Sequence, residues 1–242
     1  MIRVLTYNVQ SGLGVDSVRD IRRAGQLVAD NQADLAGLQE VEVGSPRTRF
    51  ENQPVKLAEA SGMHKVFAHG FQRGPWRFGN AVLSKYPIKS AERHELPSAG
   101  EQRSLLASVI DPGSLAGQGI CIHLLCTHLG LNRDERVDQV KEICRLVRNL
   151  DGPVVLLGDF NDFPDSPPIQ ELLSGTDLVD VTTADATFQA PEPTAKIDFI
   201  FARGLAPTGP SRVIRSMVSD HLPVVVDLEL TDRVYDLNTH RD

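Results

Sequence analysis

Residues 154–161 read VVLLGDFN, an apolar run that ends in a carboxylate and a carboxamide. A short apolar run bounded by turn residues is typical of a buried strand. Residues two apart in an extended chain point to the same side. Asp159 and Asn161 could therefore face one pocket, where the first accepts a proton and the second donates hydrogen bonds. Both residue types are also common in turns, so this stretch alone leaves a catalytic pair and a simple turn equally open.

Two further polar residues follow predicted strands near the N-terminus. Residues 3–9 and 34–41 read as strands that end near Asn8 and Glu40, with a helical pattern over residues 16–30 between them. This order predicts a crossover that sets both strands close in one sheet, with Asn8 and Glu40 at its carboxyl edge. Asn8 could be a turn residue and Glu40 a surface carboxylate. Buried strands seldom end in an unpaired charge, however, which favours a paired or ligand role for Glu40.

Two aspartates near the C-terminus have apolar neighbours. Asp198 lies in the stretch IDFIF, and Asp220 with His221 precedes the last predicted strand. A buried carboxylate needs a metal, a protonated histidine or several donors to offset its desolvation. Glu40 with Asp220 could hold a hard cation such as Mg²⁺, which prefers oxygen ligands. Asp198 beside His221 would orient the imidazole and raise its pKa.

The remaining candidates rest on weaker patterns. The strand predicted over residues 120–129 ends at His128, although a lone histidine is more often structural. Arg103 precedes a predicted strand, where a single Arg is usually solvated. Trp76 lies in residues 70–78, which read as a loop. A loop aromatic residue can flank a substrate mouth or simply cover core, and both alternatives are open.

Other segments are expected to position these side chains, and they can be given by residue range. Helices are predicted over 51–62, 132–150 and 169–173, strands over 65–68, 79–84 (opening with Asn80) and 105–110, a polar irregular segment over 90–104, a hairpin turn over 113–119 and a long loop over 187–196.

Several well-known motifs are absent from the sequence. No Cys and His residues have the ligand spacing of a zinc site. No GxxxxGK[ST] or GxGxxG sequence indicates a P-loop or dinucleotide site. No GxSxG sequence indicates a serine-nucleophile elbow.

The composition is that of an ordinary globular protein, with 41% hydrophobic and 24% charged residues among 242. Without a repeat or composition shift, a single domain over residues 1–230 and a polar tail over 231–242 are expected. No apolar run approaches the ~20 residues that span a bilayer, and the start of the chain lacks the pattern of a secretory signal. We therefore expect a cytoplasmic monomer without an obligate protein partner. The net charge of −7 argues mildly against a duplex-DNA partner.

Taken in order, the motifs resemble those of the endonuclease/exonuclease/phosphatase superfamily. They are TYN (Asn8), LQE (Glu40), GNAVLS (Asn80), THL (His128), GDFN (Asp159, Asn161), IDFIF (Asp198) and SDH (Asp220, His221). Each motif is weak alone, but their common order over nearly the whole chain is specific. The resemblance implies an α+β fold, a four-layer α/β/β/α sandwich with two packed mixed β-sheets flanked by helices and one metal site at their common edge.

The resemblance also implies a metal site beside a hydrolytic centre. Glu40 would bind Mg²⁺ or Mn²⁺, helped by Asn8 and Asp220. Asp159 would activate or orient the attacking water, and Asn161 would hold a phosphate oxygen. These roles suit phosphoester hydrolysis, in which a metal and donors must neutralise the charge between an anionic nucleophile and an anionic substrate.

The two histidines resemble those of the deoxyribonuclease branch. His221, oriented by Asp198, would stabilise the charge that develops on phosphorus. His128 resembles the second histidine of that branch, steadied by Asn80, and abasic-site enzymes carry a different residue there. Arg103 occupies a place where many members of the superfamily carry an Arg, which implies a contact with substrate.

The leading hypothesis is thus a divalent-metal-dependent hydrolase of phosphate esters with a small or headgroup-sized substrate. The arginines in the loops expected to surround the substrate are few and separated in sequence; they are Arg47, Arg49, Arg73, Arg77 and Arg103. Trp76 with Phe71 could pack against an apolar or ring-shaped leaving group. A metal-dependent nuclease acting on DNA or RNA is the alternative. A catalytically silent scaffold that binds phosphate or lipid headgroups is the weakest hypothesis, because every key motif residue is present.

Overall fold

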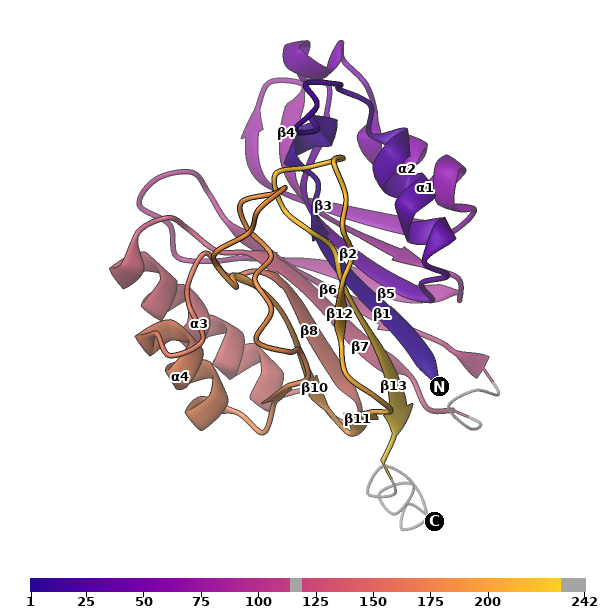
Figure 1. Cartoon of the computed structure of the whole chain (residues 1–242). Helices are drawn as coiled ribbons and strands as arrows, with labels where there is room; N and C mark the ends of the chain where they lie inside the picture. Colours follow the sequence, from indigo (N-terminus) through magenta and orange to yellow (C-terminus); the bar gives the residue numbers. More distant parts are fainter. Residues whose placement is uncertain (114–118, 232–242) are drawn as a thin grey trace.

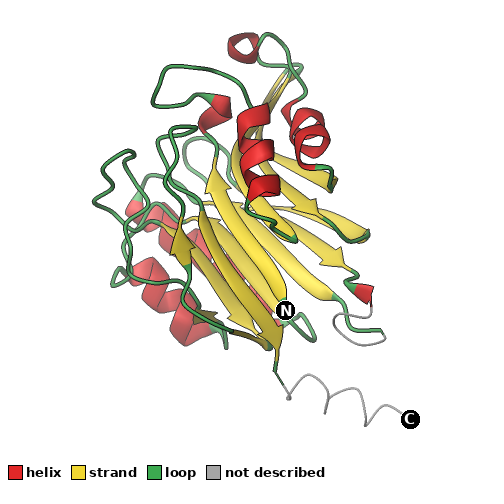
Figure 2. Ribbon diagram, turned by 45° about the vertical axis from the view of Figure 1, so that its right-hand side comes forward, coloured by secondary structure: helices red, strands yellow, loops and turns green. Residues whose placement is uncertain are grey.

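The computed structural model describes residues 1–113 and 119–231, which form two mixed β-sheets with helices on their outer faces (Figures 1 and 2). The first sheet has the order β11 (Leu205–Pro207), β13 (Val224–Leu230), β1 (Ile2–Asn8), β2 (Leu35–Val43), β4 (Trp76–Ser84) and β3 (His64–Arg73), with β12 (Arg212–Val213) paired to β13. The second has the order β5 (Ile88–Glu95), β6 (Ser104–Ile110), β7 (Ile122–His128), β8 (Val154–Asp159), β10 (Asp198–Arg203) and β9 (Val179–Asp180).

Helices cover the outer face of each sheet. Helices α1 (Arg22–Asp30) and α2 (Gln53–Ser61) lie on the first sheet, and α3 (Arg133–Arg148) and α4 (Pro167–Gly175) lie on the second (Figure 1). Two short 3₁₀ helices, η1 (Gln10–Gly12) and η2 (Pro46–Thr48), follow β1 and β2. Among the described residues, no helix is both long and apolar enough to cross a membrane.

Three apolar clusters fill the spaces between the layers. Strand residues such as Val4, Leu35, Leu124 and Leu157 pack between the sheets. A second cluster joins the outer face of β8 and β10 to α3 and α4, and a third joins β1, β2 and β4 to α1 and α2. Apolar burial on both faces explains why the central strands read as continuous apolar runs. The four-layer sandwich implied by the resemblance is confirmed.

The predicted crossover between the first two strands is confirmed. Strands β1 and β2 are parallel neighbours with Asn8 opposite Gln39, and β7 and β8 are parallel neighbours with His128 opposite Asp159. Helix α3 provides the second crossover, and it starts where the side chain of Asn132 accepts hydrogen bonds from the N–H groups of Asp134 and Glu135. Both crossovers bring strand ends with polar residues to one edge of the molecule.

Two segments predicted to be irregular are strands. Residues 70–78 belong to a hairpin in which β3 pairs with β4 and Phe71 lies opposite Phe78, so Trp76 is a strand residue next to the turn. Residues 88–95 form β5, which pairs with β6 along the edge of the sheet. β5 is almost wholly exposed, so it carries no apolar alternation that a sequence pattern could detect. Helix α1 begins at Arg22, later than the expected start at residue 16.

Some predicted segments fall on residues outside the description. The hairpin turn at 113–119 includes residues 114–118, and the polar tail at 231–242 includes residues 232–242, none of which are described. The single domain over residues 1–230 and the tail beyond it therefore remain predictions.

Gly158 permits the close approach of β8 to β7 just before Asp159. Its φ is +152°, and a Cβ built there would lie 1.9 Å from the carbonyl oxygen of Thr127, a backbone atom of β7. No side chain fits this space without separating the two strands.

We expect Gly158→Ala to lower the free energy of unfolding by about 3 kcal/mol or more, because overpacking and backbone strain add. Urea unfolding followed by circular dichroism measures the change. Gly209→Ala is the matched control, since no atom lies within 4 Å of its Cβ position. Equal stability of the two variants would contradict this account of the β7–β8 contact.

Candidate active site

The predicted polar residues converge on one edge of the two sheets. Asn8 ends β1, and His128, Asp159 and Asp198 occupy facing register positions on β7, β8 and β10. Glu40 lies in β2 with φ +59°, at an irregularity where the pairing with β4 shifts between Leu38 and Val41. The strand ends and the irregularity inside β2 thus supply the candidates from both sheets, although the sequence predicted Glu40 at the end of its strand.

Asp159 is the centre of this group, with 1% of its surface exposed. Its Oδ2 accepts a hydrogen bond from Asn8 Nδ2 at 2.9 Å and lies 3.5 Å from His128 Nε2 and 3.6 Å from His221 Nε2. Burial, followed by the charge of Asp198, raises the pKa of Asp159. A buried carboxylate with donors on several sides can both orient a water molecule and accept its proton.

His221 forms a chain with Asp198 and Thr187. His221 Nδ1 lies 2.9 Å from Asp198 Oδ2, which also accepts a hydrogen bond from Thr187 Oγ1 at 2.6 Å. Burial alone lowers the pKa of His221, but Asp198, Asp159 and Asp220 more than offset that effect and raise it to about 10. His221 is therefore protonated at neutral pH, with Nδ1–H held by Asp198 and Nε2–H directed at Asp159. The predicted pairing of Asp198 with His221 is present in the structure.

His128 has the opposite protonation state. Its Nδ1 lies 3.2 Å from Nη1 of Arg103, and a guanidinium can only donate, so Nδ1 must accept. Burial, followed by the charges of Arg103 and His221, holds the pKa of His128 well below its usual range. The ring is thus neutral, with its proton on Nε2 facing Asp159. Arg103 is 9% exposed and is not the solvated residue that its place in the sequence suggested.

Asn161 does not share a strand face with Asp159. Strand β8 ends at Asp159, and Asn161 adopts a left-handed conformation with φ +51°. Its backbone N–H donates to Asp159 Oδ1 at 2.9 Å, and its Nδ2 donates to the carbonyl of Leu129 at 2.9 Å. The extended-chain argument was wrong because the chain turns immediately after Asp159. The turn nevertheless keeps Asn161 beside the carboxylate.

The predicted metal ligands lie next to Asp159. Asn8 Nδ2 donates to Glu40 Oε1 at 3.1 Å as well as to Asp159. Asp220 Oδ2 accepts a hydrogen bond from Gln10 Nε2 at 2.9 Å. Burial, followed by opposing effects of Asn8 and Asp220, raises the pKa of Glu40. A cation would relieve this crowding of negative charge, and the two carboxylates suit a hard divalent ion.

Asn8 presents its amide nitrogen to these carboxylates, while its Oδ1 accepts from the N–H of Gln10. Direct ligation of a metal by Asn8 would require the amide to turn, so this role remains a prediction.

A second group with closely spaced ligand atoms consists of Asp159, Asp198 and His221. In that group, His221 Nδ1 and Asp198 Oδ2 are already bonded to each other. Glu40 and Asp220 are therefore better candidates for metal ligands.

Asn80 and His128 line the same small cavity. Among the described residues, no hydrogen bond joins them. Its Nδ2 donates to the carbonyl of Ser104 at 3.0 Å, and its buried Oδ1 has no partner among the described residues. Asn80, Arg103 and His128 line one small cavity of about 10 Å³. The expected support of His128 by Asn80 therefore remains a prediction.

Trp76 belongs to a separate group at the end of β2 and β4. Its Nε1 donates to the fully buried Glu42 at 3.2 Å, and the guanidinium of Arg47 lies 5.7 Å from its ring centroid and is bonded to the same carboxylate. Arg47 also donates to Ser11 Oγ, which contacts the carbonyl of Glu40. This group adjoins the metal candidates, and the role of Trp76 in substrate binding remains a prediction.

Sequence patterns missed three residues that position the site. Gln10 holds Asp220, Thr187 holds Asp198, and Ser219 Oγ donates to the carbonyl of Asn8 at 2.8 Å. Gln10 and Ser219 adjoin motif residues, which is the only signal that could have indicated them. Thr187 lies in a long loop and carries no such signal.

Comparison with known proteins identifies a matching family and one similar relative. The model of the Endonuclease/Exonuclease/phosphatase family matches residues 5–221. The uncharacterized protein YbhP of Escherichia coli (strain K12) is 31% identical over 254 residues, which cover 94% of this chain and 96% of YbhP. The family match spans every strand end that contributes to the candidate site.

Two solved structures share the fold. The endonuclease/exonuclease/phosphatase from Beutenbergia cavernae DSM 12333 has a TM-score of 0.75 and 24% identity, covering 95% of this chain and 71% of its own. The mannosyl-6-phosphatase Bt3783 of Bacteroides thetaiotaomicron VPI-5482 has a TM-score of 0.73 and 20% identity, covering 94% of this chain and 99% of its own. At this identity the likeness concerns the fold.

The raised pKa of His221 predicts that the free energy of unfolding depends on pH. Because its pKa rises from 6.5 to about 10 on folding, its stabilising contribution is fully present below pH 6.5 and is lost as the pH rises toward 10. The difference in free energy of unfolding between the wild type and His221→Gln should therefore shrink across this range. Urea unfolding of chelator-treated protein measures it.

His123→Gln is the control for this experiment, since burial lowers the pKa of His123. The difference in free energy of unfolding between the wild type and His123→Gln should not shrink between pH 6.5 and 10. A constant difference for His221→Gln would show that the imidazole is not held in its protonated form by Asp198.

Proposed function

Because the chain belongs to the endonuclease/exonuclease/phosphatase family, we propose that it is a divalent-metal-dependent hydrolase of phosphate esters. The observation that carries the proposal is the convergence of Asn8, His128 and His221 on the buried carboxylate of Asp159. This arrangement has a base, a cationic donor and a neutral donor around one point. In-line attack of water on phosphorus requires such groups together.

The residues then have distinct roles in the proposed reaction. Asp159 orients a water molecule and accepts its proton, since its carboxylate is central and its pKa is raised. His221 stabilises the negative charge that develops on phosphorus, because Asp198 keeps it protonated and in a fixed orientation. His128 donates a hydrogen bond from Nε2–H without adding charge, and the backbone N–H of Asn161 donates to Asp159 Oδ1. The proposed contact of the Asn161 side chain with a phosphate oxygen requires it to leave the carbonyl of Leu129.

Glu40 and Asp220 are the proposed ligands of Mg²⁺ or Mn²⁺, supported by Asn8 and Gln10. A divalent ion held there supplies charge neutralisation at a phosphoryl oxygen. Hydrogen bonds from Asn8 and Gln10 hold the carboxylates of Glu40 and Asp220 in place. Oxygen ligands from two carboxylates match the preferences of these ions.

We propose a small or headgroup-sized substrate over duplex DNA. The net charge is −7, and tight binding to a duplex needs several phosphate contacts from Lys and Arg. Arg103 is the buried cation that contacts the centre through His128. A nuclease acting on DNA or RNA is the alternative. The expected cytoplasmic location, monomeric state and lack of a protein partner remain predictions.

Activity should disappear with chelator and return with Mg²⁺ or Mn²⁺. A metal-supplemented screen over small phosphomonoesters, phosphodiesters, phospholipids and plasmid DNA provides both the substrate class and this test. Full activity after exhaustive chelation would overturn the metal proposal. Efficient plasmid nicking without turnover of small substrates would select the nuclease alternative.

In the same assay, Glu40→Gln should raise the metal concentration for half-maximal activity by about 10-fold or more. Glu229→Gln, a change near the opposite end of the first sheet, serves as the control. An unchanged metal requirement in Glu40→Gln would remove Glu40 from the metal site.

Asp159→Asn should lower kcat by roughly 10²- to 10⁴-fold, the usual contribution of a positioned acid or base. The fold should persist, because removing a buried charge offsets the weakened hydrogen bond to Asn8. Steady-state kinetics with metal and a thermal melt test both statements. A variant that keeps most of its rate would exclude Asp159 as the base.

A further inference from the structure

Glu40 is held in an unusual backbone conformation. Its φ is +59°, in the left-handed region that a residue with a side chain seldom adopts, and the pairing of β2 with β4 shifts between Leu38 and Val41. An irregularity of this kind re-aims a side chain next to a functional site. Such a conformation persists only where neighbouring groups fix it. The contacts around Glu40 therefore determine where its carboxylate points.

The turn that follows β1 has the same character. Gln10, Ser11 and Gly12 have φ values of +44°, +50° and +78°. The side chain of Gln10 donates to Asp220 Oδ2 at 2.9 Å. This turn, η1, thus holds the second carboxylate proposed to bind the metal, while the irregularity in β2 carries the first. The distance between the two carboxylates depends on how η1 is attached to β2.

Gln53 connects these two segments. It is the first residue of α2, and 1% of its surface is exposed. Its Oε1 accepts from the N–H of Glu42 at 2.8 Å, and its Nε2 donates to the carbonyl of Ser11 at 2.9 Å. The orientation of the amide is fixed, because only its oxygen can accept and only its nitrogen can donate. A buried amide that is bonded at both ends holds η1 and β2 at one separation.

Ser11 adds a second connection between η1 and β2. Its hydroxyl donates to the carbonyl of Glu40 at 3.2 Å and accepts from Arg47 Nη2 at 3.1 Å. Arg47 Nε donates in turn to the fully buried Glu42 at 2.7 Å. These hydrogen bonds run from η1 to both sides of the irregularity and back, so η1 and β2 cannot shift independently.

The start of α2 does not depend on the side chain of Gln53. Asn52 caps the helix, since its side chain accepts from the N–H of Val55. The amide of Gln53 instead reaches away from its own helix to Glu42 and Ser11. Both of its hydrogen bonds therefore go to the two segments that hold the proposed metal ligands.

We propose that Gln53 and Ser11 are positioning residues that set the spacing between the carboxylates of Glu40 and Asp220, and thereby the preference for a small divalent ion. This inference rests on the proposed metal-dependent hydrolase. Mg²⁺ requires near-ideal octahedral geometry at short distances, whereas Ca²⁺ accepts variable geometry at longer ones. A fixed spacing favours the smaller ion, and a loosened spacing loses that preference.

Gln53→Met tests the proposal, because it removes both hydrogen bonds of the amide and keeps a side chain of similar length. Competition of Mg²⁺ and of Ca²⁺ against Mn²⁺, followed by the electron paramagnetic resonance signal of free Mn²⁺, gives both affinities without an activity assay. The Mg²⁺ affinity should fall by about 10-fold or more, the usual effect of losing a group that orients a ligand, and the Ca²⁺ affinity should fall less. Equal losses for the two ions, or no loss, would overturn the proposal.

Ser11→Gly tests the second connection and replaces Gln53→Met if that variant does not fold. Glycine readily adopts the positive φ of Ser11, so the turn is retained while the hydroxyl is lost. The Mg²⁺ affinity should again fall more than the Ca²⁺ affinity. An unchanged ratio of the two affinities in this variant would refute the proposal.

Gln139→Met is the matched control. Gln139 is fully buried and, like Gln53, joins a backbone N–H to a carbonyl, with Gly130 and Pro97 each at 2.9 Å. It lies on α3, against the second sheet. Its loss should lower the free energy of unfolding and leave the ratio of the two metal affinities unchanged. An equal change of the ratio in the control would mean general loosening and would overturn the proposal.

The wild type separates this inference from the proposed function. Absence of Mn²⁺ binding to the wild type would refute the metal site and the inference together. Binding of Mn²⁺ that is weakened by Glu40→Gln, with the same ratio of Mg²⁺ to Ca²⁺ affinity in Gln53→Met as in the wild type, would support the metal site and refute the positioning role alone.

Discussion

The structure depends on a buried carboxylate that no single sheet can stabilise. Asp159 ends a central strand of the second sheet and has almost no contact with solvent. An isolated charge in such a place is strongly unfavourable, so its partners are part of the fold. One partner, Asn8, comes from the first sheet, and His128 comes from the neighbouring strand of the second. The carboxylate thus joins the two sheets at the edge that holds the candidate site.

The two histidines beside Asp159 show how similar groups acquire different chemistry from their surroundings. His221 faces three carboxylates and holds its proton, whereas His128 faces the guanidinium of Arg103 and stays neutral. Both rings direct Nε2 at the same oxygen. One group can therefore offset negative charge while the other donates a hydrogen bond without adding positive charge. Separated protonation states of this kind are a feature of acid–base sites.

The sequence predicted the parts of this site that end buried strands. Asn8, Glu40, His128 and Asp159 each follow an apolar run, and parallel pairing then brings them to one edge. The sequence failed at Asn161 because the chain bends after Asp159 and Asn161 adopts a left-handed conformation. It also failed at β5, where an exposed edge strand has no buried face and hence no pattern. Arg103 was misjudged as solvated because its contact with His128 joins residues far apart in the chain.

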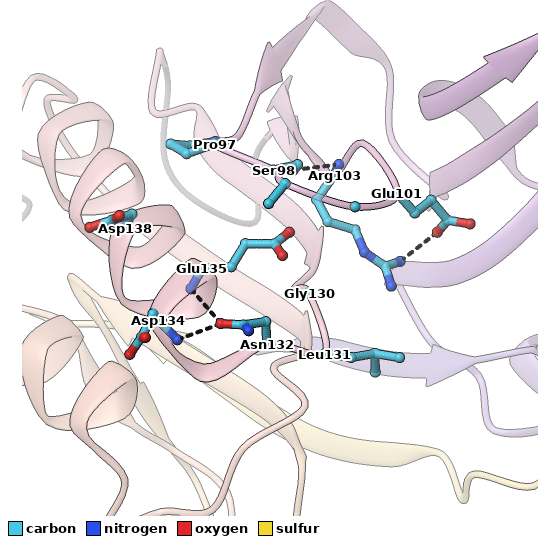
Figure 3. A pocket seen from close by; sticks show the side chains of 12 residues that line it. Pro97, Ser98, Glu101, Arg103, Gly130, Leu131, Asn132, Asp134, Glu135 and Asp138 are labelled. Carbon is cyan, nitrogen blue, oxygen red and sulfur yellow. Dashed lines mark hydrogen bonds and ion pairs between the residues drawn. The ribbon is translucent and has the colours of Figure 1, made fainter.

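The same contrast between buried strand ends and exposed segments separates the candidate site from the connections around it. Asp159, His221 and Glu40 lie on or next to strands whose register is fixed by two packed sheets. A cleft of about 880 Å³ instead lies between the connection of β5 to β6 and the first turns of α3 (Figure 3). Arg103 belongs to both regions, since its backbone ends that connection and its guanidinium contacts His128. Changes in the connection or in α3 can therefore occur while the hydrogen bonds around Asp159 stay in place. This separation follows from the fold, because surface connections tolerate substitution that buried strand ends do not.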